Sequence, residues 1–313
     1  MPYADSATIV LGADGFLGRN LVKYWRARDW PVHAIGRGAG DHTDPTVADA
    51  AFAAAPRDSA RIFHAVTKQR TGAIQYELQG ELLRDNAAIH LNVLEAWRRR
   101  QPQAKLISLG SSCVYPESPR PIPETAFRSG PPHASVRGYA LAKEILAVGC
   151  ETYQSQYGLR WLHGILATVY GPHAHIEPQR SHFMAALIAR AAAAKASGAS
   201  ELEVWGNPAT VRDLLYVSDQ IEALIAADQA FENAIVNVTS NAPVRIGDCA
   251  QAILAALNWD ARLTYPEGSF QGAGYKSLDS SRFLGLTGWA PKIALEDGVR
   301  RTLAAMQQGA RRR

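Results

Sequence analysis

A tyrosine and a lysine four residues apart are well placed in this sequence for proton transfer. Tyr139 and Lys143 belong to the segment Tyr-Ala-Leu-Ala-Lys, and this spacing puts both side chains on one face of a helix. An ammonium group beside a phenol is expected to lower the pKa of the phenol, so that Tyr139 can give or take the proton that accompanies hydride transfer. Ser111 precedes Tyr139 by 28 residues and follows a predicted strand, and its hydroxyl can hydrogen-bond a carbonyl or alkoxide. The three residues predict a centre that reduces a ketone or oxidises an alcohol.

A glycine-rich turn near the start of the chain predicts a dinucleotide site. Residues 12–18 read Gly-Ala-Asp-Gly-Phe-Leu-Gly, directly after a predicted strand and at the start of a predicted helix. Glycines there allow a tight turn and a close approach of the backbone to a pyrophosphate, which the helix N-terminus then faces. Because the motif lies between a strand and a helix, we interpret it as a nucleotide-binding turn.

The end of the second predicted strand indicates which dinucleotide binds. A site selective for NAD usually places a carboxylate there to hold the ribose diol. Gly36 offers no side chain, whereas Arg37 can pair with a 2′-phosphate through its planar guanidinium. NADP(H) is therefore the predicted cofactor. Asp41, a little further on, is either a contact to the adenine or the cap of a loop, and the sequence leaves both open.

These motifs, in this order, resemble those of the extended short-chain dehydrogenase/reductases over nearly the whole chain. A narrower resemblance, to the GDP-L-fucose synthase family, rests on Leu-Gly-Ser-Ser-Cys-Val-Tyr-Pro (109–116), Tyr-Gly-Pro-His (170–173), Ser181-His182, Val-Trp-Gly (204–206) and Arg-Asp-Leu-Leu-Tyr-Val (212–217). It implies an NADPH-dependent epimerase and 4-ketoreductase that acts on a GDP-linked 4-keto-6-deoxy sugar.

The resemblance also implies that Cys113 and His182 exchange protons with the sugar. A 4-keto sugar has acidic C–H bonds at C3 and C5, and inverting them needs one group to remove a proton and another to return one from the opposite face. A thiol and an imidazole have pKa values suited to that task near neutral pH. The alternative for Cys113 is a small packing residue, since free cysteines are often buried.

The remaining site residues are implied by the same resemblance. The predicted cofactor-binding residues are Gly12, Gly15, Phe16, Leu17, Gly18, Arg37, Asp41, His42, Ala65, Asn86, Leu109, Tyr139, Lys143, Leu166, Val169 and His182. The predicted substrate-binding residues are Ser112, Thr168, Arg190, Trp205, Arg212 and Lys276. No group of residues has the spacing of metal ligands, so no metal site is predicted.

Three departures from the family pattern concern the substrate. Leu-Ala-Thr-Val (166–169) lacks an expected asparagine, residues 67–72 replace a Gly-Gly loop, and residues 269–276 replace a Lys/Arg-rich segment. A 4-ketoreductase without epimerisation, or an NAD-dependent nucleotide-sugar 4-epimerase or 4,6-dehydratase, therefore stays open. A non-catalytic sensor of the cofactor is a further alternative, although such proteins typically lose the Tyr or the Lys.

The elements that must position these residues alternate along the chain. Short β-branched runs at 8–11, 32–35, 62–66, 106–109 and 162–166 are separated by amphipathic stretches that include predicted helices at 86–100 and 139–157. This pattern predicts an α/β protein, with a Rossmann-type doubly wound parallel sheet and a smaller α+β C-terminal substrate lobe. We expect the dinucleotide-binding domain at 1–169 plus about 212–240, and the substrate lobe at 170–211 and 241–313.

Composition narrows the partners. The 313 residues are 47% hydrophobic and 20% charged, with a net charge of +4, and no apolar run is long enough to span a bilayer. The basic clusters 98–100 and 311–313 lie at an expected helix end and at the terminus, which does not indicate nucleic-acid binding. The three separate cysteines and the absence of a secretory signal predict a cytoplasmic enzyme. The family resemblance suggests a homodimer through the helices at 86–100 and 139–157.

Overall fold

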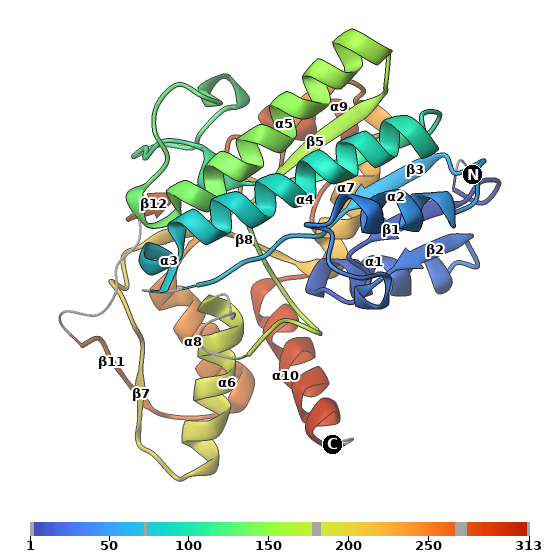
Figure 1. The fold of residues 1–313 in the computed structure, drawn as a ribbon. Coiled ribbons are helices and arrows are strands. Elements are labelled where there is room, and N and C mark those ends of the chain that lie inside the picture. Colours follow the sequence, from blue (N-terminus) through green and yellow to red (C-terminus); the bar gives the residue numbers. More distant parts are fainter. Residues whose placement is uncertain (1–2, 72–73, 177–182, 267–273, 312–313) are drawn as a thin grey trace.

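A six-stranded parallel sheet forms the centre of the computed structural model, which describes residues 3–71, 74–176, 183–266 and 274–311 (Figure 1). Its strand order is β2-β1-β3-β4-β5-β9. The strands are β1 (Thr8–Leu11), β2 (Val32–Ile35), β3 (Arg61–His64), β4 (Lys105–Ser111), β5 (Trp161–Leu166) and β9 (Ala234–Val238). Starting from β1 the chain winds outward in both directions, so the predicted doubly wound parallel sheet is confirmed.

Helices cover both faces of this sheet because both faces of its strands are apolar. Ile9 and Leu11 of β1 point to one face, where α2 (Pro45–Ala53), α4 (Gln79–Arg100) and α5 (Arg137–Tyr157) pack. Val10 points to the other face, which α1 (Phe16–Arg26) and α7 (Val217–Ala230) cover. The alternation follows from the two-residue period of a strand.

The helix α4 begins earlier than the predicted start at residue 86. Its first turns already bury Leu82, and two of its buried positions carry the polar residues Asn86 and His90. Polar residues at core-facing positions interrupt the apolar period from which the helix was predicted. The basic residues at its C-terminus are engaged locally, since Arg98 pairs with Glu95 and Arg100 with Asp49.

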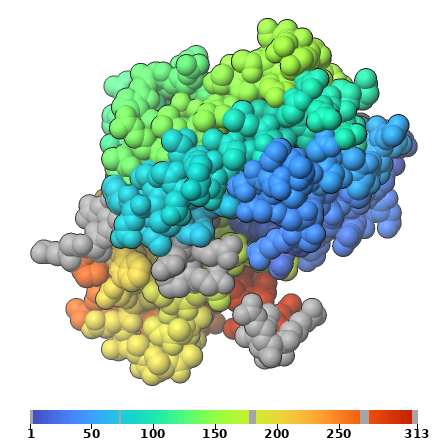
Figure 2. Space-filling model, viewed as in Figure 1, coloured from blue at the N-terminus to red at the C-terminus, as the bar shows by residue number. Residues whose placement is uncertain are grey.

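Much of the rest of the chain forms a smaller α+β part, most of which lies below the main sheet in Figure 1 and below the blue and green atoms in Figure 2 (yellow to red). A second sheet joins β10 (Pro243–Arg245), β8 (Val211–Tyr216) and β12 (Tyr275–Lys276), with β6 (Thr168–Tyr170) also paired to β8, and β7 (Glu201–Glu203) pairs with β11 (Arg262–Thr264). The helices are α6 (Phe183–Ala196), α8 (Ile246–Leu257), α9 (Ser281–Thr287) and α10 (Leu295–Arg311), while the short α3 (Ile74–Glu77) precedes α4. The expected domain boundaries stay a prediction. In the parts of the chain that the structure describes, no helix combines the length and apolarity needed to cross a membrane.

A close contact joins the N-terminal ends of α4 and α5 and so fixes the first turn of α5, where Tyr139 lies. The Gln79 side-chain Oε1 accepts a hydrogen bond of 2.6 Å from the Gly138 backbone N–H, and its Nε2 donates to the Ser135 carbonyl at 2.8 Å. A Cβ atom on Gly138 would lie 2.1 Å from the Gln79 backbone oxygen. Only glycine allows the two helices to approach this closely.

Gly138→Ala is expected to destabilise the protein by about 1–3 kcal/mol, because the added methyl group must push the two helices apart. Gly80→Ala, in the same helix as Gln79 but facing open space, is the matched control, and we expect it to stabilise by up to about 1 kcal/mol. Urea denaturation measures both free energies of unfolding. Equal stability of the two variants would show that the helices yield without cost.

Candidate active site

A cavity of about 500 Å³ opens where the parallel strands end. Ligands of doubly wound sheets bind at this edge, outside the carboxyl ends of the strands. Fourteen of the residues singled out from the sequence line the cavity: Gly12, Gly15, Phe16, Leu17, Arg37, Asp41, His42, Ala65, Leu109, Ser111, Tyr139, Lys143, Leu166 and Val169. The structure therefore brings the glycine turn, the end of the second strand and the Ser-Tyr-Lys residues to one place.

The glycine turn lies tightly against the neighbouring strand. Gly12 has a φ of +88°, and a Cβ atom there would lie 2.9 Å from the Ala65 carbonyl carbon, so a larger residue does not fit. Helix α1 then begins at Phe16 with no side-chain cap at Gly15 and no acidic residue in its first turn. Uncapped N–H groups and the positive end of the helix dipole suit a pyrophosphate at this end of the cavity.

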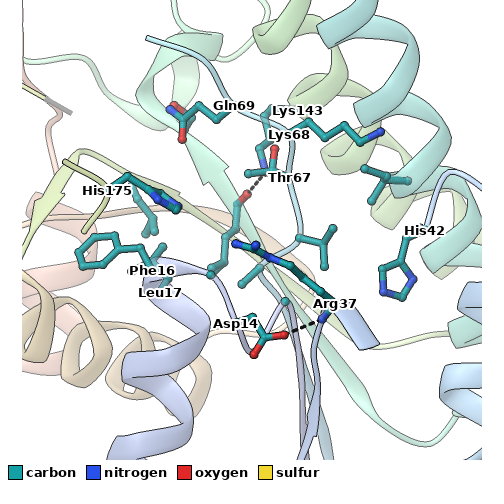
Figure 3. A pocket seen from close by; sticks show the side chains of 18 of the residues that line it. Asp14, Phe16, Leu17, Arg37, His42, Thr67, Lys68, Gln69, Lys143 and His175 are labelled. Carbon is teal, nitrogen blue, oxygen red and sulfur yellow. Dashed lines mark hydrogen bonds between the residues drawn. The ribbon is translucent and has the colours of Figure 1, made fainter. Parts of the chain in front are cut away.

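Asp14 fills the space that a side chain at position 36 would occupy, a contact that the sequence analysis did not foresee. Its Oδ2 accepts a hydrogen bond of 2.6 Å from the Arg37 backbone N–H, and a Cβ atom on Gly36 would lie 2.2 Å from that oxygen. The Arg37 side chain extends into the cavity above it (Figure 3). The Asp14 carboxylate thus lies against the Arg37 backbone at the end of β2, and the guanidinium extends away from this contact.

The loop after β3 is held by Asn86 from behind the cavity. Asn86 is fully buried, its Oδ1 accepts from the Thr67 hydroxyl (2.9 Å) and the Lys68 backbone N–H (2.7 Å), and its Nδ2 donates to the Lys68 carbonyl (2.8 Å). Asn86 and the predicted Gly18 do not line the cavity, whereas Thr67 and Lys68 do. Asp41 lines the cavity and also caps its own loop, accepting from the Thr43 N–H at 3.0 Å.

Tyr139 and Lys143 lie together at the inner end of the cavity, as their spacing predicts. The Lys143 ammonium nitrogen is 5.8 Å from the centre of the Tyr139 ring and donates to the Leu109 carbonyl at 2.8 Å. Burial lowers the pKa of Lys143 to about 7 and, with the nearby Cys113 thiol, raises the pKa of Tyr139. The expected lowering of the Tyr139 pKa is therefore wrong, because desolvation of the buried phenol is the largest effect on it and raises the pKa.

Three buried histidines, which the sequence analysis passed over, share the interior with Lys143. His64 Nε2 and His90 Nδ1 are 2.8 Å apart, and His163 Nδ1 is 2.7 Å from the Ser108 hydroxyl. Burial, and after it the charge of Lys143, lowers the pKa of each imidazole, so all three are neutral near pH 7. Histidines in the middle of apolar strands, such as those of β3 and β5, are the sequence feature that could have pointed to them.

Cys113 lies beside this centre with two cations of the smaller part of the chain. Its backbone N–H donates to the Ser111 hydroxyl at 3.2 Å, and the Lys276 ammonium lies 3.1 Å from its sulfur. Burial alone would raise the pKa of the Cys113 thiol, but the charge of Lys276, the hydrogen bonds with Ser111 and Lys276 and the charge of Arg212 together lower it. Predicted His182 lies outside the described residues.

Arg190 and Trp205, predicted to bind the substrate, stack on each other. The guanidinium carbon of Arg190 lies 4.1 Å from the centre of the Trp205 ring, and 55% of Trp205 is exposed. An exposed indole beneath a cation is not a core residue, and part of its aromatic surface stays open to solvent. Of the other predicted substrate residues, Ser112 is buried and Thr168 is half-buried at the start of β6.

Lys143→Met is expected to stabilise the unliganded protein. Lys143 is 3% exposed, and folding lowers its pKa from about 10.4 to about 7, so the charged form is penalised. The penalty is complete below pH 7 and disappears as the pH rises towards 10.4. The variant should melt on the order of 5 °C higher than the native chain at pH 7, with a difference that shrinks by pH 10. A difference that does not vary with pH would contradict the buried cation.

Residues 8–239 match the NAD dependent epimerase/dehydratase family. The chain is similar to the probable GDP-L-fucose synthase 1 of Oryza sativa subsp. japonica, with 34% identity over 68% of this chain and 66% of the relative. It is 30% identical to the GDP-L-fucose synthase of Escherichia coli (strain K12), over 71% of this chain and 72% of that one. The chain thus spans 61–66% of the length of three of its rice and Arabidopsis relatives.

Solved structures share the whole fold at lower identity. A GDP-L-fucose synthetase from Naegleria fowleri bound to NADP superposes with a TM-score of 0.87 at 21% identity, covering 98% of this chain and 96% of that one. A GDP-6-OMe-4-keto-L-xylo-heptose reductase from C. jejuni gives a TM-score of 0.87 at 19% identity, covering 97% and 98%. The family match over residues 8–239 and the relatives at 30–34% identity show that the chain belongs to the NAD-dependent epimerase/dehydratase family, among the extended short-chain dehydrogenase/reductases.

Proposed function

We propose that this protein is an NADP(H)-dependent epimerase and 4-ketoreductase of a nucleotide-linked 4-keto-6-deoxy sugar, with GDP as the nucleotide. The observation that carries the proposal is the convergence of Ser111, Tyr139 and Lys143 at the inner end of the cavity with Cys113 beside them. The names of the sequence relatives support the sugar and the nucleotide. The NADP-bound neighbour supports the cofactor.

In the reductive step, Tyr139 gives the proton and Ser111 holds the carbonyl oxygen. NADPH, when bound, supplies the hydride. The raised pKa of Tyr139 keeps its phenol protonated at neutral pH, which is the state that a proton donor to the developing alkoxide needs. The Lys143 ammonium, anchored on the Leu109 carbonyl, lies close enough to favour the phenolate that remains.

In the epimerising step, Cys113 removes the proton next to the ketone and His182 returns one from the other face. The lowered pKa of the Cys113 thiol increases the fraction of thiolate that can act as the base. Exchange at C3 and C5 needs the carbonyl and therefore precedes reduction. His182 keeps this role by its place in the sequence, next to Phe183 at the start of α6.

The cofactor site favours NADPH through Arg37, the one basic side chain at the end of β2. The uncapped start of α1 and the space kept open by Gly12 would hold the pyrophosphate. Asp14, whose carboxylate adjoins the Arg37 backbone, would oppose a 2′-phosphate. The two charged residues therefore act in opposite directions on the choice of cofactor.

A simple 4-ketoreductase remains the second candidate, since two structural neighbours bear the names of GDP-sugar reductases, a heptose 4-keto reductase and a mannoheptose C4 reductase.

The homodimer through the helices at 86–100 and 139–157 also stays a proposal. In its favour, α4 and α5 lie side by side on one face of the sheet and expose Leu91 and Tyr157 (Figure 1).

Arg37→Ala is expected to weaken NADPH binding by about 1.5–3 kcal/mol and to leave NADH binding nearly unchanged, because it removes a charged hydrogen bond to the 2′-phosphate. Asp14→Asn keeps an acceptor for the Arg37 N–H, loses the negative charge and should bind NADPH several-fold more tightly. Fluorescence titration gives the dissociation constants. A native chain that uses both cofactors equally would contradict the assignment.

Two variants separate the proposed half-reactions on GDP-4-keto-6-deoxymannose in D2O. Tyr139→Phe should reduce the ketone about a hundredfold more slowly and still incorporate deuterium at C3 and C5. Cys113→Ser replaces the thiol with a poor base and should lose that deuterium while direct reduction stays measurable. NMR of the product and absorbance at 340 nm report the two steps, and Cys150→Ser, at a buried thiol away from the cavity, is the control. Reduction by the native chain without deuterium at either carbon would leave a simple ketoreductase.

A further inference from the structure

The three cysteines of this chain are in opposite electrostatic surroundings. Cys150 and Cys249 are fully buried in apolar clusters, and burial raises the pKa of each thiol to about 12. Cys113 is partly exposed and faces ionisable groups from three other elements: Lys276 of β12, Arg212 of β8, and Tyr139 and Lys143 of α5. Only its thiol pKa is lowered among the three. Lys276 and Arg212 lower the pKa of Cys113 against the effect of burial, which raises it.

Lys276 reaches Cys113 from a segment that is held rigidly. Its strand β12 pairs with β8, with Lys276 opposite Arg212. The residues that follow are fixed by the buried Asp213, whose carboxylate accepts from the Ser277 hydroxyl at 2.8 Å and from the Leu278 N–H at 2.7 Å. The backbone next to Lys276 is therefore held by a buried, hydrogen-bonded carboxylate on the neighbouring strand.

The Cys113 side of the contact is fixed by a second buried residue. Tyr115, two residues after Cys113, donates its hydroxyl hydrogen to the Asn237 side chain at 2.7 Å. Asn237 in turn donates to the carbonyls of Ile122 (2.8 Å) and Asp279 (2.9 Å), and Asp279 follows Lys276 closely in the chain. One amide thus ties the segment of Cys113 to the segment of Lys276, although the two residues are far apart in sequence.

The ammonium of Lys276 has no carboxylate partner among the described residues. Its polar contact is with the Cys113 sulfur at 3.1 Å. By contrast, Lys68, Arg100 and Lys292 each pair with an Asp or Glu side chain. Arg212 likewise shows no ion pair in the described part of the chain and donates to the Val211 carbonyl. A half-buried cation is expected to have a counter-charge, and a thiolate at Cys113 would provide it.

We propose that Lys276 is the counter-ion that holds Cys113 as a thiolate beside Ser111, as a positioning residue for proton removal from the substrate. The removal of a proton from the substrate rests on the function proposed above. The ion pair between Lys276 and Cys113 rests on the contact between them and does not depend on that function. The sequence assigned Lys276 to substrate anchoring, and the contact with the sulfur gives it a different task.

The ion pair accounts for one complete step. The thiolate takes the proton from the carbon next to the ketone, the electron pair of that C–H bond moves into the ring bond, and the carbonyl electrons move onto the oxygen to give an enolate. The proton stays on Cys113 as a thiol, so the charge passes from sulfur to the oxygen near Ser111 and Tyr139. Lys276 stabilises the thiolate and thereby lowers its basicity, which matches it to a carbon acid near neutral pH.

Alkylation by iodoacetamide, followed by mass spectrometry of the Cys113 peptide in the purified full chain, tests the ion pair without substrate. Because the thiolate is the reactive form, Lys276→Met should slow alkylation at pH 7 by about tenfold or more and move its midpoint to higher pH. Lys276→Arg should restore much of the native rate, and Arg212→Met should have the smaller effect. Lys292→Met, which removes a surface lysine paired with Glu222, is the matched control and should leave the rate unchanged.

A second measurement needs no lysine variant. Thiolate absorbance at 240 nm, taken as the difference between the native chain and Cys113→Ser across pH, should show a thiol that ionises below its ordinary range. An unchanged alkylation profile in folded Lys276→Met, with a raised KM for the sugar nucleotide, would overturn the proposal and leave Lys276 as a substrate anchor. If instead the alkylation results hold but native enzyme shows no deuterium exchange, the ion pair stands and the epimerase assignment fails.

Discussion

All six strands of the main sheet run in the same direction, and the site depends on that constraint. Parallel strands open their carboxyl ends at one edge, so the loops that follow them must meet there. The turn at Gly12 follows β1, Arg37 follows β2, Thr67 follows β3, Ser111 ends β4 and Leu166 ends β5. These residues are far apart in the sequence and line one cavity. The common direction of the strands brings them together, and no contact between the residues themselves is needed for this.

Burial shifts the pKa values of Tyr139 and Lys143, which both line this cavity, in opposite directions. Desolvation disfavours charge, so it raises the pKa of Tyr139 and lowers that of Lys143, and the neutral form of the phenol is stable near pH 7. At Cys113 the same penalty is outweighed, because Lys276 and Arg212 are close. The charge on Cys113 in turn raises the pKa of both Tyr139 and Lys143. The groups proposed for the two half-reactions are thus electrostatically coupled, and ionisation of the thiol helps to keep the phenol protonated for the later step.

How much the sequence could predict depends on the range of the interaction. The glycine turn and the pair Tyr139 and Lys143 are defined by spacing within one turn or one helix, and the structure places them at one cavity. The contact of Asp14 with Gly36, and that of Lys276 with Cys113, join distant segments whose approach only the tertiary structure decides. The direction of the Tyr139 pKa shift was missed for a related reason, since the neighbouring cation is visible in the sequence and the depth of burial is not.

The reaction type and the substrate are specified by different parts of the chain. The proton and hydride chemistry proposed above draws on β4, α5 and the edge of the main sheet, where the sequence keeps the family pattern. The groups that would hold the sugar nucleotide come from β8, β12, α6 and the loop that carries Trp205. The buried Asp213 and Asn237 fix the backbone near Lys276 and Cys113. Since these two residues fix the backbone and not the side chains that point to the substrate, the loops can change while Lys276 stays on Cys113. A chain built this way can change its sugar and keep its acid–base centre.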